Sequence, residues 1–484
     1  MGFKMTKEDI VFIVTPSLWS SNMYSTGMLC LSAYLEKKGF KNIILDSALC
    51  RGRVSGAAAE KAILNKVKEL QPKVVCFSST HKEFDEVVRL NNSIKSTVNN
   101  VFTIVGGPQP TYRPGDFLNN DFDFVGIGEG EVILYEFVRE VLSQSYRWSN
   151  IKGLYWKNGP KNTLNPPREL MTREELDDTP LLTYGKINKK YFDIDIRMIR
   201  GLPLRGALMM TTRGCPFSCS YCGCNLTFGR KIRSYTLEHI EREIKYLKEE
   251  YGVEGIWLAD DTFTVNRNHA IGVSGILKKH GIIWGCQSRV DTIDEKLAAI
   301  MGGSGCVQID FGVESGSQRI LDDIIGKRTN VKQVESAFKI AKKYKIRTLA
   351  NFMIGLPTES HEDLKKTEQL ADRIKADVCI FSIATPLPGT KLYDMVGEEI
   401  KPQEYAMLDW NGSALMERIN KSELNNLCKE RNRLEKKYFL LTVVRSIFSK
   451  YNISFFLKRK YKCRRIGFIL RYLLNYISSR SCSG

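Results

Sequence analysis

The chain has 484 residues, of which 43% are hydrophobic and 26% are charged, a globular composition with room for about three domains. It contains no run of about 18 apolar residues and no basic, apolar leader at the N-terminus, so we expect a cytoplasmic protein without a membrane-spanning helix. The 13 cysteines lack the spacing of a disulfide framework, which excludes a disulfide-stapled scaffold and fits a reducing compartment.

Most of the net charge of +18 lies at the C-terminal end of the chain. Residues 441–484 contain ten Lys or Arg and no Asp or Glu, so the other 440 residues carry only +8. We expect residues 400–484 to form a basic helical extension, with a charged helix over 422–438. Its tail could contact a membrane peripherally or bind an anionic substrate, but a helical cap with a solvated basic face is the reading we favour.

Residues 1–143 alternate short apolar segments with amphipathic ones, which predicts a doubly wound, Rossmann-like α/β domain with a parallel sheet. Such sheets bind ligands at the carboxyl ends of their strands, where glycine lets the backbone approach a ligand, although ordinary turns also use glycine. The expected strands are 10–14, 43–45, 74–77, 102–105 and 122–125, and the residues at their ends include Ser78, Ser79, Thr80, Gly106, Gly107, Pro108, Gly126, Gly128, Glu129 and Gly130.

Residues 144–206 are expected to connect two domains. Asn158–Gly159, between short β-rich segments, predicts a hairpin. The sequence from Pro166 to Pro180 indicates an extended surface linker without candidate chemistry.

Cys215, Cys219 and Cys222 form a C-x-x-x-C-x-x-C motif after the apolar segment 207–210. Thiolates are soft ligands, so three of them within eight residues favour zinc or an iron–sulfur cluster. A structural zinc site needs a fourth ligand, for which Cys224 is the tightly spaced candidate, whereas a cubane cluster with three cysteines keeps one iron open. Spacing alone favours iron–sulfur over zinc or unrelated core cysteines.

Residues 207–399 repeat a strand–helix pattern six times, which predicts a partial (β/α)6 barrel with its chemistry at the carboxyl ends of the strands. One helix is expected to begin after Thr236 and to end at Gly252, with an apolar face formed by Leu237, Ile240, Ile244 and Leu247. The expected strands are 207–212, 255–259, 282–287, 307–313, 347–354 and 378–384, followed by the three cysteines, Asp260 and Asp261, Gln287 and Arg289, Glu314 and Ser315, Gly355 to Glu359, and Pro386 to Thr390.

Each acid at a strand end could instead cap a helix or form an ion pair. The presence of several polar clusters on one face of the predicted barrel nevertheless favours a functional site there. The five histidines do not cluster with them, which argues against a histidine-based metal centre or a Ser-His-Asp triad. We identify no catalytic residue from the sequence.

The cysteine motif, with Tyr221 before its third cysteine, resembles that of the radical S-adenosylmethionine (radical SAM) enzymes. The resemblance implies a 4Fe–4S cluster on Cys215, Cys219 and Cys222 whose open iron binds SAM, and reductive cleavage of SAM to a 5′-deoxyadenosyl radical. It also implies SAM contacts from Tyr221, from Asp260 and Asp261 to the amino group, from Glu314 and Ser315 to the ribose and carboxylate, and from Gly355, Leu356 and Pro357 to the adenine. Arg289 could pair with the SAM carboxylate, because a guanidinium suits bidentate contact.

The first domain resembles the cobalamin-binding domain that precedes many radical SAM modules, through Gly106-Gly107-Pro108 and the Gly128-Glu129 segment. The resemblance implies that cobalamin is held by Ser78, Ser79, Thr80, Gly106, Gly107, Pro108, Gly128 and Glu129. Where such domains carry D-x-H-x-x-G, this chain has Asp46 to Arg51 without histidine. We therefore expect cobalamin to bind without a histidine ligand.

The leading hypothesis is a cobalamin-dependent radical SAM C-methyltransferase of class B type, which uses two SAM molecules per turnover and an external electron donor of flavodoxin or ferredoxin type. The alternatives are a radical cyclisation, rearrangement or oxidation, a tRNA methylthiotransferase with a second cluster on Cys30, Cys50 and Cys76, and a non-enzymatic, zinc-stabilised nucleic-acid-binding protein. Cys30 and Cys76 are expected to be ordinary buried residues. The substrate class is left open between a small molecule, a natural product and a lipid.

Overall fold

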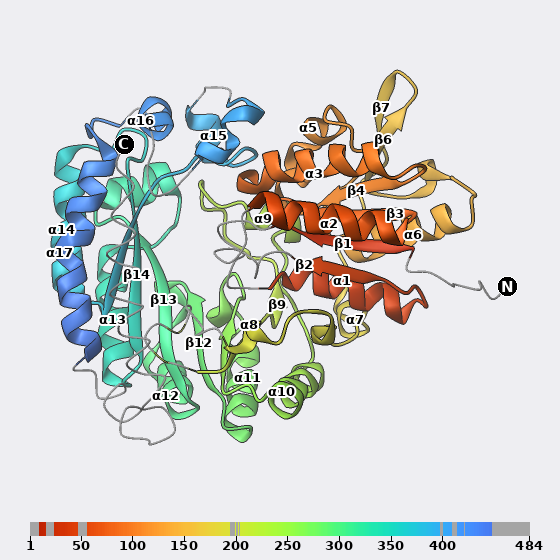
Figure 1. Cartoon of the computed structure of the whole chain (residues 1–484). Coiled ribbons are helices and arrows are strands. Elements are labelled where there is room, and N and C mark those ends of the chain that lie inside the picture. Colours follow the sequence, from red (N-terminus) through yellow and green to blue (C-terminus); the bar gives the residue numbers. More distant parts are fainter. Residues whose placement is uncertain are drawn as a thin grey trace.

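The protein is described by a computed structural model that covers residues 9–15, 24–46, 56–193, 199, 202, 204–396, 400–408, 414–420 and 422–447. Two α/β units lie side by side, and the long C-terminal helix lies on the outer side of the second unit (Figure 1). The basic tail beyond residue 447 lies outside the described residues.

The first unit has a seven-stranded sheet in the order β2-β1-β3-β4-β5-β6-β7. Strands β1 to β5 are parallel, which confirms the predicted doubly wound domain. Helix α1 packs against α6, and α2 packs against α3. The strands are β1 (Ile10–Val14), β2 (Ile43–Asp46), β3 (Val74–Ser78), β4 (Phe102–Gly106) and β5 (Phe124–Gly126), and the helices are α1 (Thr26–Lys37), α2 (Gly56–Leu70), α3 (Phe84–Thr97), α4 (Pro108–Tyr112), α5 (Pro114–Leu118) and α6 (Gly130–Leu142).

The predicted hairpin forms, but it belongs to this sheet rather than to a free connector. Strand β6 (Leu154–Asn158) pairs antiparallel with β5, and β7 (Lys161–Leu164) pairs antiparallel with β6. The turn between them includes Gly159, whose φ of 61° is in the left-handed region. The hairpin thus covers the edge that β5 would otherwise expose.

The second unit has a six-stranded parallel sheet in the order β15-β14-β13-β12-β11-β8, the predicted partial barrel. A two-stranded ribbon, β9 (Thr212–Arg213) with β10 (Arg233–Ser234), follows the first strand. The remaining strands are β8 (Gly206–Met209), β11 (Gly255–Leu258), β12 (Ile283–Ser288), β13 (Cys306–Glu314), β14 (Arg347–Ile354) and β15 (Val378–Ile383). The long helices are α10 (Leu237–Tyr251), α11 (Arg267–Lys279), α12 (Glu295–Gly303), α13 (Val331–Lys343) and α14 (His361–Ile374), and the short ones are α7 (Arg173–Asp177), α8 (Lys190–Asp193), α9 (Cys224–Phe228) and α15 (Lys391–Val396).

Helix α10 forms as its sequence predicts. The Thr236 hydroxyl accepts a hydrogen bond from the His239 amide, and Gly252 ends the helix at a φ of 62°. Ile240, Ile244 and Leu247 are fully buried, but Leu237 is 37% exposed because it lies at the margin of the contact with α11.

The C-terminal segment closes the open side of the second sheet. Helix α16 (Ala414–Asn420) precedes α17 (Leu427–Ile447), which packs along β15. The Tyr438 ring stacks on Phe381, with centroids 5.4 Å apart. The charged helix begins five residues later than predicted, because the Asn426 side chain accepts from the Lys429 amide and caps the first turn.

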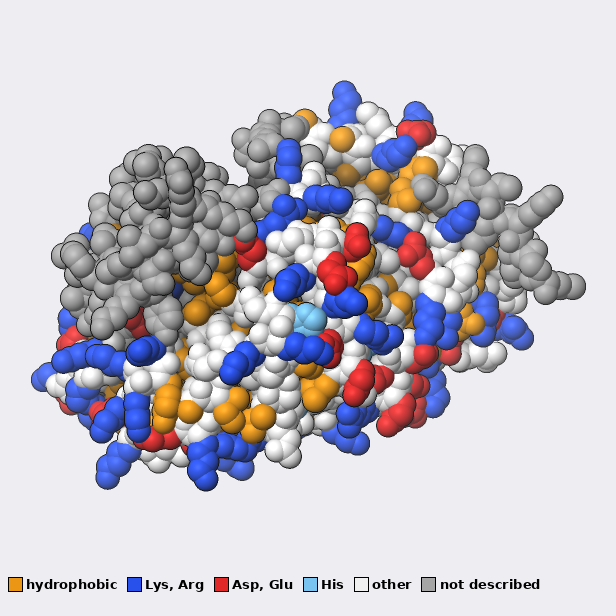
Figure 2. Space-filling model, turned by 90° about the horizontal axis from the view of Figure 1, so that it is seen from below, with side chains coloured by type: hydrophobic (Ala, Val, Ile, Leu, Met, Phe, Trp, Pro, Cys, Tyr) orange, Lys and Arg blue, Asp and Glu red, His pale blue; other side chains and the backbone are white. Residues whose placement is uncertain are grey.

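Charges of both signs are interspersed on the face seen in Figure 2, where Asp and Glu lie among Lys and Arg. Within the described part of the chain, no helix combines the length and apolarity needed to cross a membrane.

Candidate active site

A cavity of about 590 Å³ lies between the two sheets and is lined by both units. From the first unit, residues at the carboxyl ends of β3, β4 and β5 line it, together with the first turns of α1 and α6. From the second unit it is lined by Met210, Cys224, Asp261 and Leu387, which follow strands of the barrel. The carboxyl ends of β3, β4 and β5 and the segments after β8, β11 and β15 therefore open into one space. The other barrel residues predicted for the cluster and SAM do not line this cavity: Cys215, Cys219, Cys222, Tyr221, Arg289, Glu314, Ser315, Gly355, Leu356 and Pro357.

Most of the residues predicted for cobalamin line this cavity: Ser78, Thr80, Gly106, Gly107, Pro108, Gly128 and Glu129. Ser79 does not line it, because it is fully buried and its hydroxyl donates to the Thr80 carbonyl at 2.9 Å. At Gly107, where φ is 104°, an added Cβ would lie 2.7 Å from the Ser78 hydroxyl. Only glycine fits the wall of the cavity there.

The Glu129 carboxylate is engaged by the second unit. One oxygen accepts from Arg213 at 3.0 Å, and the other accepts from Arg233 at 2.7 Å and from the Met171 amide at 2.8 Å. Because both oxygens of its side chain are engaged, Glu129 could contact cobalamin only through its backbone.

The three-cysteine loop follows the β8–β9 segment and is held by backbone contacts. The Cys215 amide donates to the Gly229 carbonyl at 3.3 Å, and the Ser220 amide donates to the Ile325 carbonyl at 2.9 Å. At Gly214, an added Cβ would lie 2.4 Å from the Lys231 carbonyl, so the loop can take this path only with glycine.

The thiols of this loop have separate neighbours. The Cys215 thiol lies 3.6 Å from the Thr262 hydroxyl, whereas that of Cys222 is hydrogen-bonded to Cys224, which also contacts Asp261. Among the described residues, no three His, Cys, Asp or Glu side chains are grouped closely enough to hold one metal ion, and this includes the three thiols of the loop.

Two cations lie beside the cysteine loop. The Arg289 guanidinium lies 3.6 Å from the centroid of the Phe217 ring and 3.6 Å from the Cys219 sulfur, while it pairs with Asp291 at 2.8 Å. Burial raises the pKa of Cys219, whereas the charges of Lys327 and Arg289 lower it. Cys219, a soft donor next to two buried cations, thus suits an anionic, thiolate-bound cluster.

Lys327, which the sequence analysis missed, also holds Glu314. Its ammonium lies 2.6 Å from a Glu314 oxygen that accepts from the Tyr221 hydroxyl at 2.8 Å. Glu314 has a φ of 69°, a left-handed conformation that the two contacts hold in place. No local pattern around Gly326-Lys327 marks this lysine, since its partner lies on β13.

The neighbouring acids Asp260 and Asp261 have different surroundings. The Asp260 carboxylate is fully buried and accepts from the Thr211 and Thr212 amides, each at 2.6 Å, and burial raises its pKa to about 6. Asp261 lines the cavity, and burial raises its pKa as well. Only Asp261 thus presents its side chain to a ligand space.

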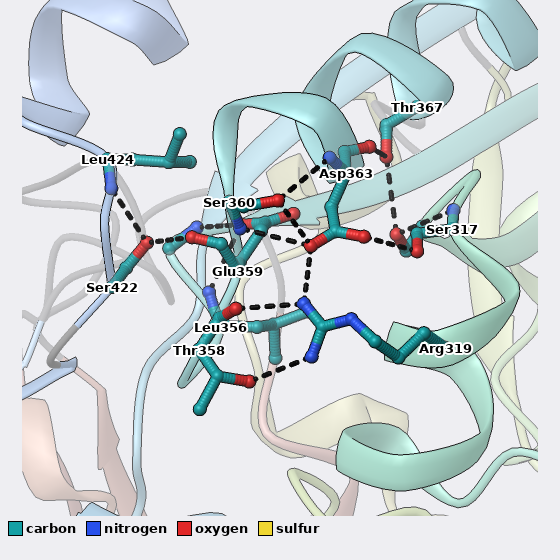
Figure 3. A network of polar contacts seen from close by, with 12 residues as sticks. Ser317, Arg319, Leu356, Thr358, Glu359, Ser360, Asp363, Thr367, Ser422 and Leu424 are labelled. Atoms are coloured by element: carbon teal, nitrogen blue, oxygen red, sulfur yellow. Dashed lines mark hydrogen bonds and ion pairs between the residues drawn. The ribbon is translucent and has the colours of Figure 1, made fainter.

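The loop after β14 is built around Glu359 (Figure 3). Its carboxyl accepts from the Gly355 amide at 2.5 Å and from the Leu356 amide at 3.3 Å, and its other oxygen has no partner. Burial raises the pKa of Glu359 to about 8, so the side chain is mostly neutral at pH 7. Ser315, also buried, lies 3.2 Å from the Thr367 hydroxyl.

Cys30 and Cys76 are buried in α1 and β3, as expected for structural residues, and burial raises the pKa of both thiols. Cys50 lies outside the described residues.

Two α/β units thus share one cavity, with a three-cysteine loop beside it. The family model of the radical SAM superfamily matches residues 209–371, and that of the B12 binding domain matches residues 20–138. An uncharacterised methyltransferase of Pyrococcus horikoshii is 32% identical over 84% of this chain and 84% of its own length. The cytidylyl-2-hydroxyethylphosphonate methyltransferase of Streptomyces wedmorensis is 26% identical over 76% of this chain and 77% of its own.

The radical SAM methyltransferase TsrM of Kitasatospora setae, solved with cobalamin and a 4Fe–4S cluster, has the same fold. Its TM-score is 0.67 at 17% identity, covering 80% of this chain and 74% of TsrM. This chain belongs to the radical SAM superfamily, in the group with an N-terminal B12 binding domain. The two family models assign a 4Fe–4S cluster, SAM and cobalamin as its cofactors.

Proposed function

We propose that the enzyme transfers a methyl group to a carbon atom of a small organic substrate, inside the cavity between the two units. The observation that carries the proposal is that the ends of β3, β4 and β5 and the segments after β8, β11 and β15 open into the same space of about 590 Å³. When bound, the cluster with SAM supplies a 5′-deoxyadenosyl radical, and cobalamin supplies the methyl carrier. The chain itself holds these groups in register and keeps water away from the radical.

On the barrel side, Cys215, Cys219 and Cys222 hold the cluster. Asp261 binds the SAM amino group, because Asp261 lines the cavity while the Asp260 carboxylate accepts from the Thr211 amide. Arg289 is committed to Asp291 and to the cysteine loop, so its role is to hold Cys219 and Phe217 rather than the SAM carboxylate.

The other SAM contacts come from two loops. Glu314 and Ser315 hold the ribose and carboxylate, with Tyr221 and Lys327 fixing the Glu314 side chain. The backbone of Gly355, Leu356 and Pro357 binds the adenine, and Glu359 fixes the shape of this segment.

On the first side, Ser78, Thr80, Gly106, Gly107, Pro108 and Gly128 hold cobalamin. These residues would hold cobalamin without a histidine of the chain. His81 lines the cavity, but its Nε2 lies 3.1 Å from the Leu408 carbonyl and is engaged there. The cobalt(II) form is expected to show no nitrogen coupling from the protein in its electron paramagnetic resonance (EPR) spectrum.

The reaction draws its electron from an external donor of flavodoxin or ferredoxin type. The peripheral membrane contact considered for the basic tail concerns residues outside the described part of the chain, and the fold adds nothing in its favour.

The proposal is tested by anaerobic purification and reconstitution, with iron, sulfide and cobalt analysis. About four irons and one cobalamin per chain, with 5′-deoxyadenosine formed on reduction, are the expected result. A product heavier by one methylene unit supports methyl transfer, whereas an unchanged or smaller mass supports the cyclisation, rearrangement or oxidation considered as the alternative. Iron without cobalt would refute the assignment of the cavity, and zinc without iron would refute the whole mechanism.

A further inference from the structure

Four charged side chains are buried where the two units meet. Glu129 and Glu131 come from the segment after β5, and Arg213 and Arg233 come from the β9–β10 ribbon. Each of the four side chains is between 4% and 6% exposed. Two carboxylates and two guanidinium groups are therefore enclosed together with balanced charge.

Every member of the cluster is paired across the boundary. Arg213 donates to Glu129 at 3.0 Å and to Glu131 at 2.6 Å, and Arg233 donates to Glu129 at 2.7 Å. Arg213 also donates to the Tyr235 hydroxyl at 3.1 Å. Burial raises the pKa of Glu131, but the charge and hydrogen bond of Arg213 outweigh it and leave that pKa below its ordinary value.

The ribbon brings the two arginines together and joins them to the cysteine loop. Arg213 and Arg233 are directly opposite in the antiparallel register of β9 and β10. Arg213 is followed by Gly214, whose backbone is enclosed by the Lys231, Phe228 and Gly229 carbonyls, and then by Cys215. A shift of the Arg213 backbone would therefore be transmitted to the first cysteine of the loop.

We propose that Glu129 and Glu131 are positioning residues for the cluster loop, so that the first unit completes the cluster site of the second through Arg213. The contacts belong to the structure itself, but the meaning of the loop as a cluster site rests on the proposed function. Residues 128–131 then contribute in two ways. Gly128 and Gly130 line the cavity, and the carboxylates of Glu129 and Glu131 pair with arginines of the second unit.

The physical reason is the cost of an unpaired buried charge. If Glu131 loses its charge, Arg213 keeps a buried guanidinium with one carboxylate fewer, and water or a loop movement must compensate. The movement is expected at Arg213 itself, because β9 pairs with β10 over only two residues.

The test compares Glu131→Gln and Arg213→Lys with Glu140→Gln. Glu140 lies on α6 like Glu131, is 3% exposed, and pairs with Arg147 at 3.3 Å without reaching the barrel. Hydrogen–deuterium exchange of the apo chain is measured over residues 213–222. We expect exchange there to rise about tenfold or more in Glu131→Gln and Arg213→Lys, and to stay at the wild-type value in Glu140→Gln.

A second readout uses the reconstituted cluster. In Glu131→Gln, the EPR spectrum of the reduced, SAM-bound cluster should shift relative to wild type, a change that a loss of folding stability alone would not produce. Equal behaviour of Glu131→Gln and Glu140→Gln in both measurements would overturn the inference while leaving the proposed function intact. If wild-type protein assembles no cluster, the proposed function fails, and the exchange of the apo chain still decides the inference.

Discussion

At the scale of single residues, burial decides which acids can serve a ligand. Asp260 and Asp261 are neighbours, but one carboxylate holds two backbone amides of the chain and the other lines the cavity. The sequence places both at the end of the second barrel strand and cannot separate them. Their difference depends on the hydrogen bonds that Asp260 accepts from the Thr211 and Thr212 amides, which lie 48 to 49 residues earlier in the chain.

Glu359 should make stability depend on pH. Its pKa is raised by burial to about 8, so the folded state keeps the proton that the unfolded chain releases near pH 4.5. Stability from this group is therefore fully present below about pH 4.5 and is lost as pH rises to 8. In Glu359→Gln, which is always neutral, the free energy of unfolding should fall less over this window, by up to about 4 kcal/mol.

Denaturant unfolding of wild type and Glu359→Gln between pH 5 and 8.5 measures this difference. Glu362→Gln, at an exposed position in the first turn of α14, is the control and should run parallel to wild type. Parallel curves for all three proteins would show that Glu359 is ionised in the folded state.

Gly107 and Gly128 form a matched pair for the cobalamin side of the cavity. Both have positive φ, 104° and 88°, so alanine at either position costs about 1–2 kcal/mol in backbone conformation. Only at Gly107 does the added Cβ meet a neighbour, the Ser78 hydroxyl at 2.7 Å, whereas nothing lies within 4 Å at Gly128. Gly107→Ala should weaken cobalamin binding at least about tenfold more than Gly128→Ala, as measured by absorbance titration. Equal affinities would remove Gly107 from the cobalamin wall.

At the scale of elements, the C-terminal segment supports the loop predicted to bind adenine. The Ser422 hydroxyl and the Glu423 amide both donate to the Glu359 carbonyl, at 3.0 Å and 3.2 Å (Figure 3 shows Ser422 beside Glu359). An added Cβ on Gly355 would lie 2.7 Å from a Leu427 methyl group. Helix α17 thus covers both the edge strand β15 and the back of this loop.

Leu427→Ala should therefore affect SAM binding as well as stability. Removing this buried side chain leaves a cavity and costs about 2–5 kcal/mol of stability, and the Gly355 loop loses its support. Leu434→Ala, two turns further along the same helix and equally buried, should cost similar stability without changing the SAM dissociation constant. Calorimetric SAM titration of both variants decides the point, and an equal effect on SAM affinity would refute the support by Leu427.

The positions of the strands along the chain could be predicted because their signal is local. Buried parallel strands are short apolar segments between helices, and five strands of the first sheet and six of the second follow that pattern. The place of the hairpin could not be predicted, since Tyr155 pairs with Val125 across 30 residues. The Asn-Gly turn fixes the hairpin but not its partner.

At the scale of the whole molecule, no local sequence pattern indicates that the two units share a cavity. Arg213 and Glu129 are 84 residues apart, and each looks ordinary in its own segment, one beside a cysteine motif and one beside a glycine turn. Their pairing depends on how the two sheets face one another. Sequence reasoning predicted both sets of strand ends, but not that they open into one space.

The two cofactor sites should nevertheless load independently. The cysteines hold the cluster from the barrel, the cobalamin residues follow β3, β4 and β5, and the Arg213 network that joins the two units uses none of these thiols as a charged partner. In the Cys215/Cys219/Cys222→Ala triple variant, iron should fall to background while the cobalamin dissociation constant stays within about threefold of wild type. Iron analysis and absorbance titration on the same preparation measure both quantities. Loss of cobalamin together with iron would mean that the cluster itself organises the cavity, because the substitutions leave the first sheet and its docking residues unchanged.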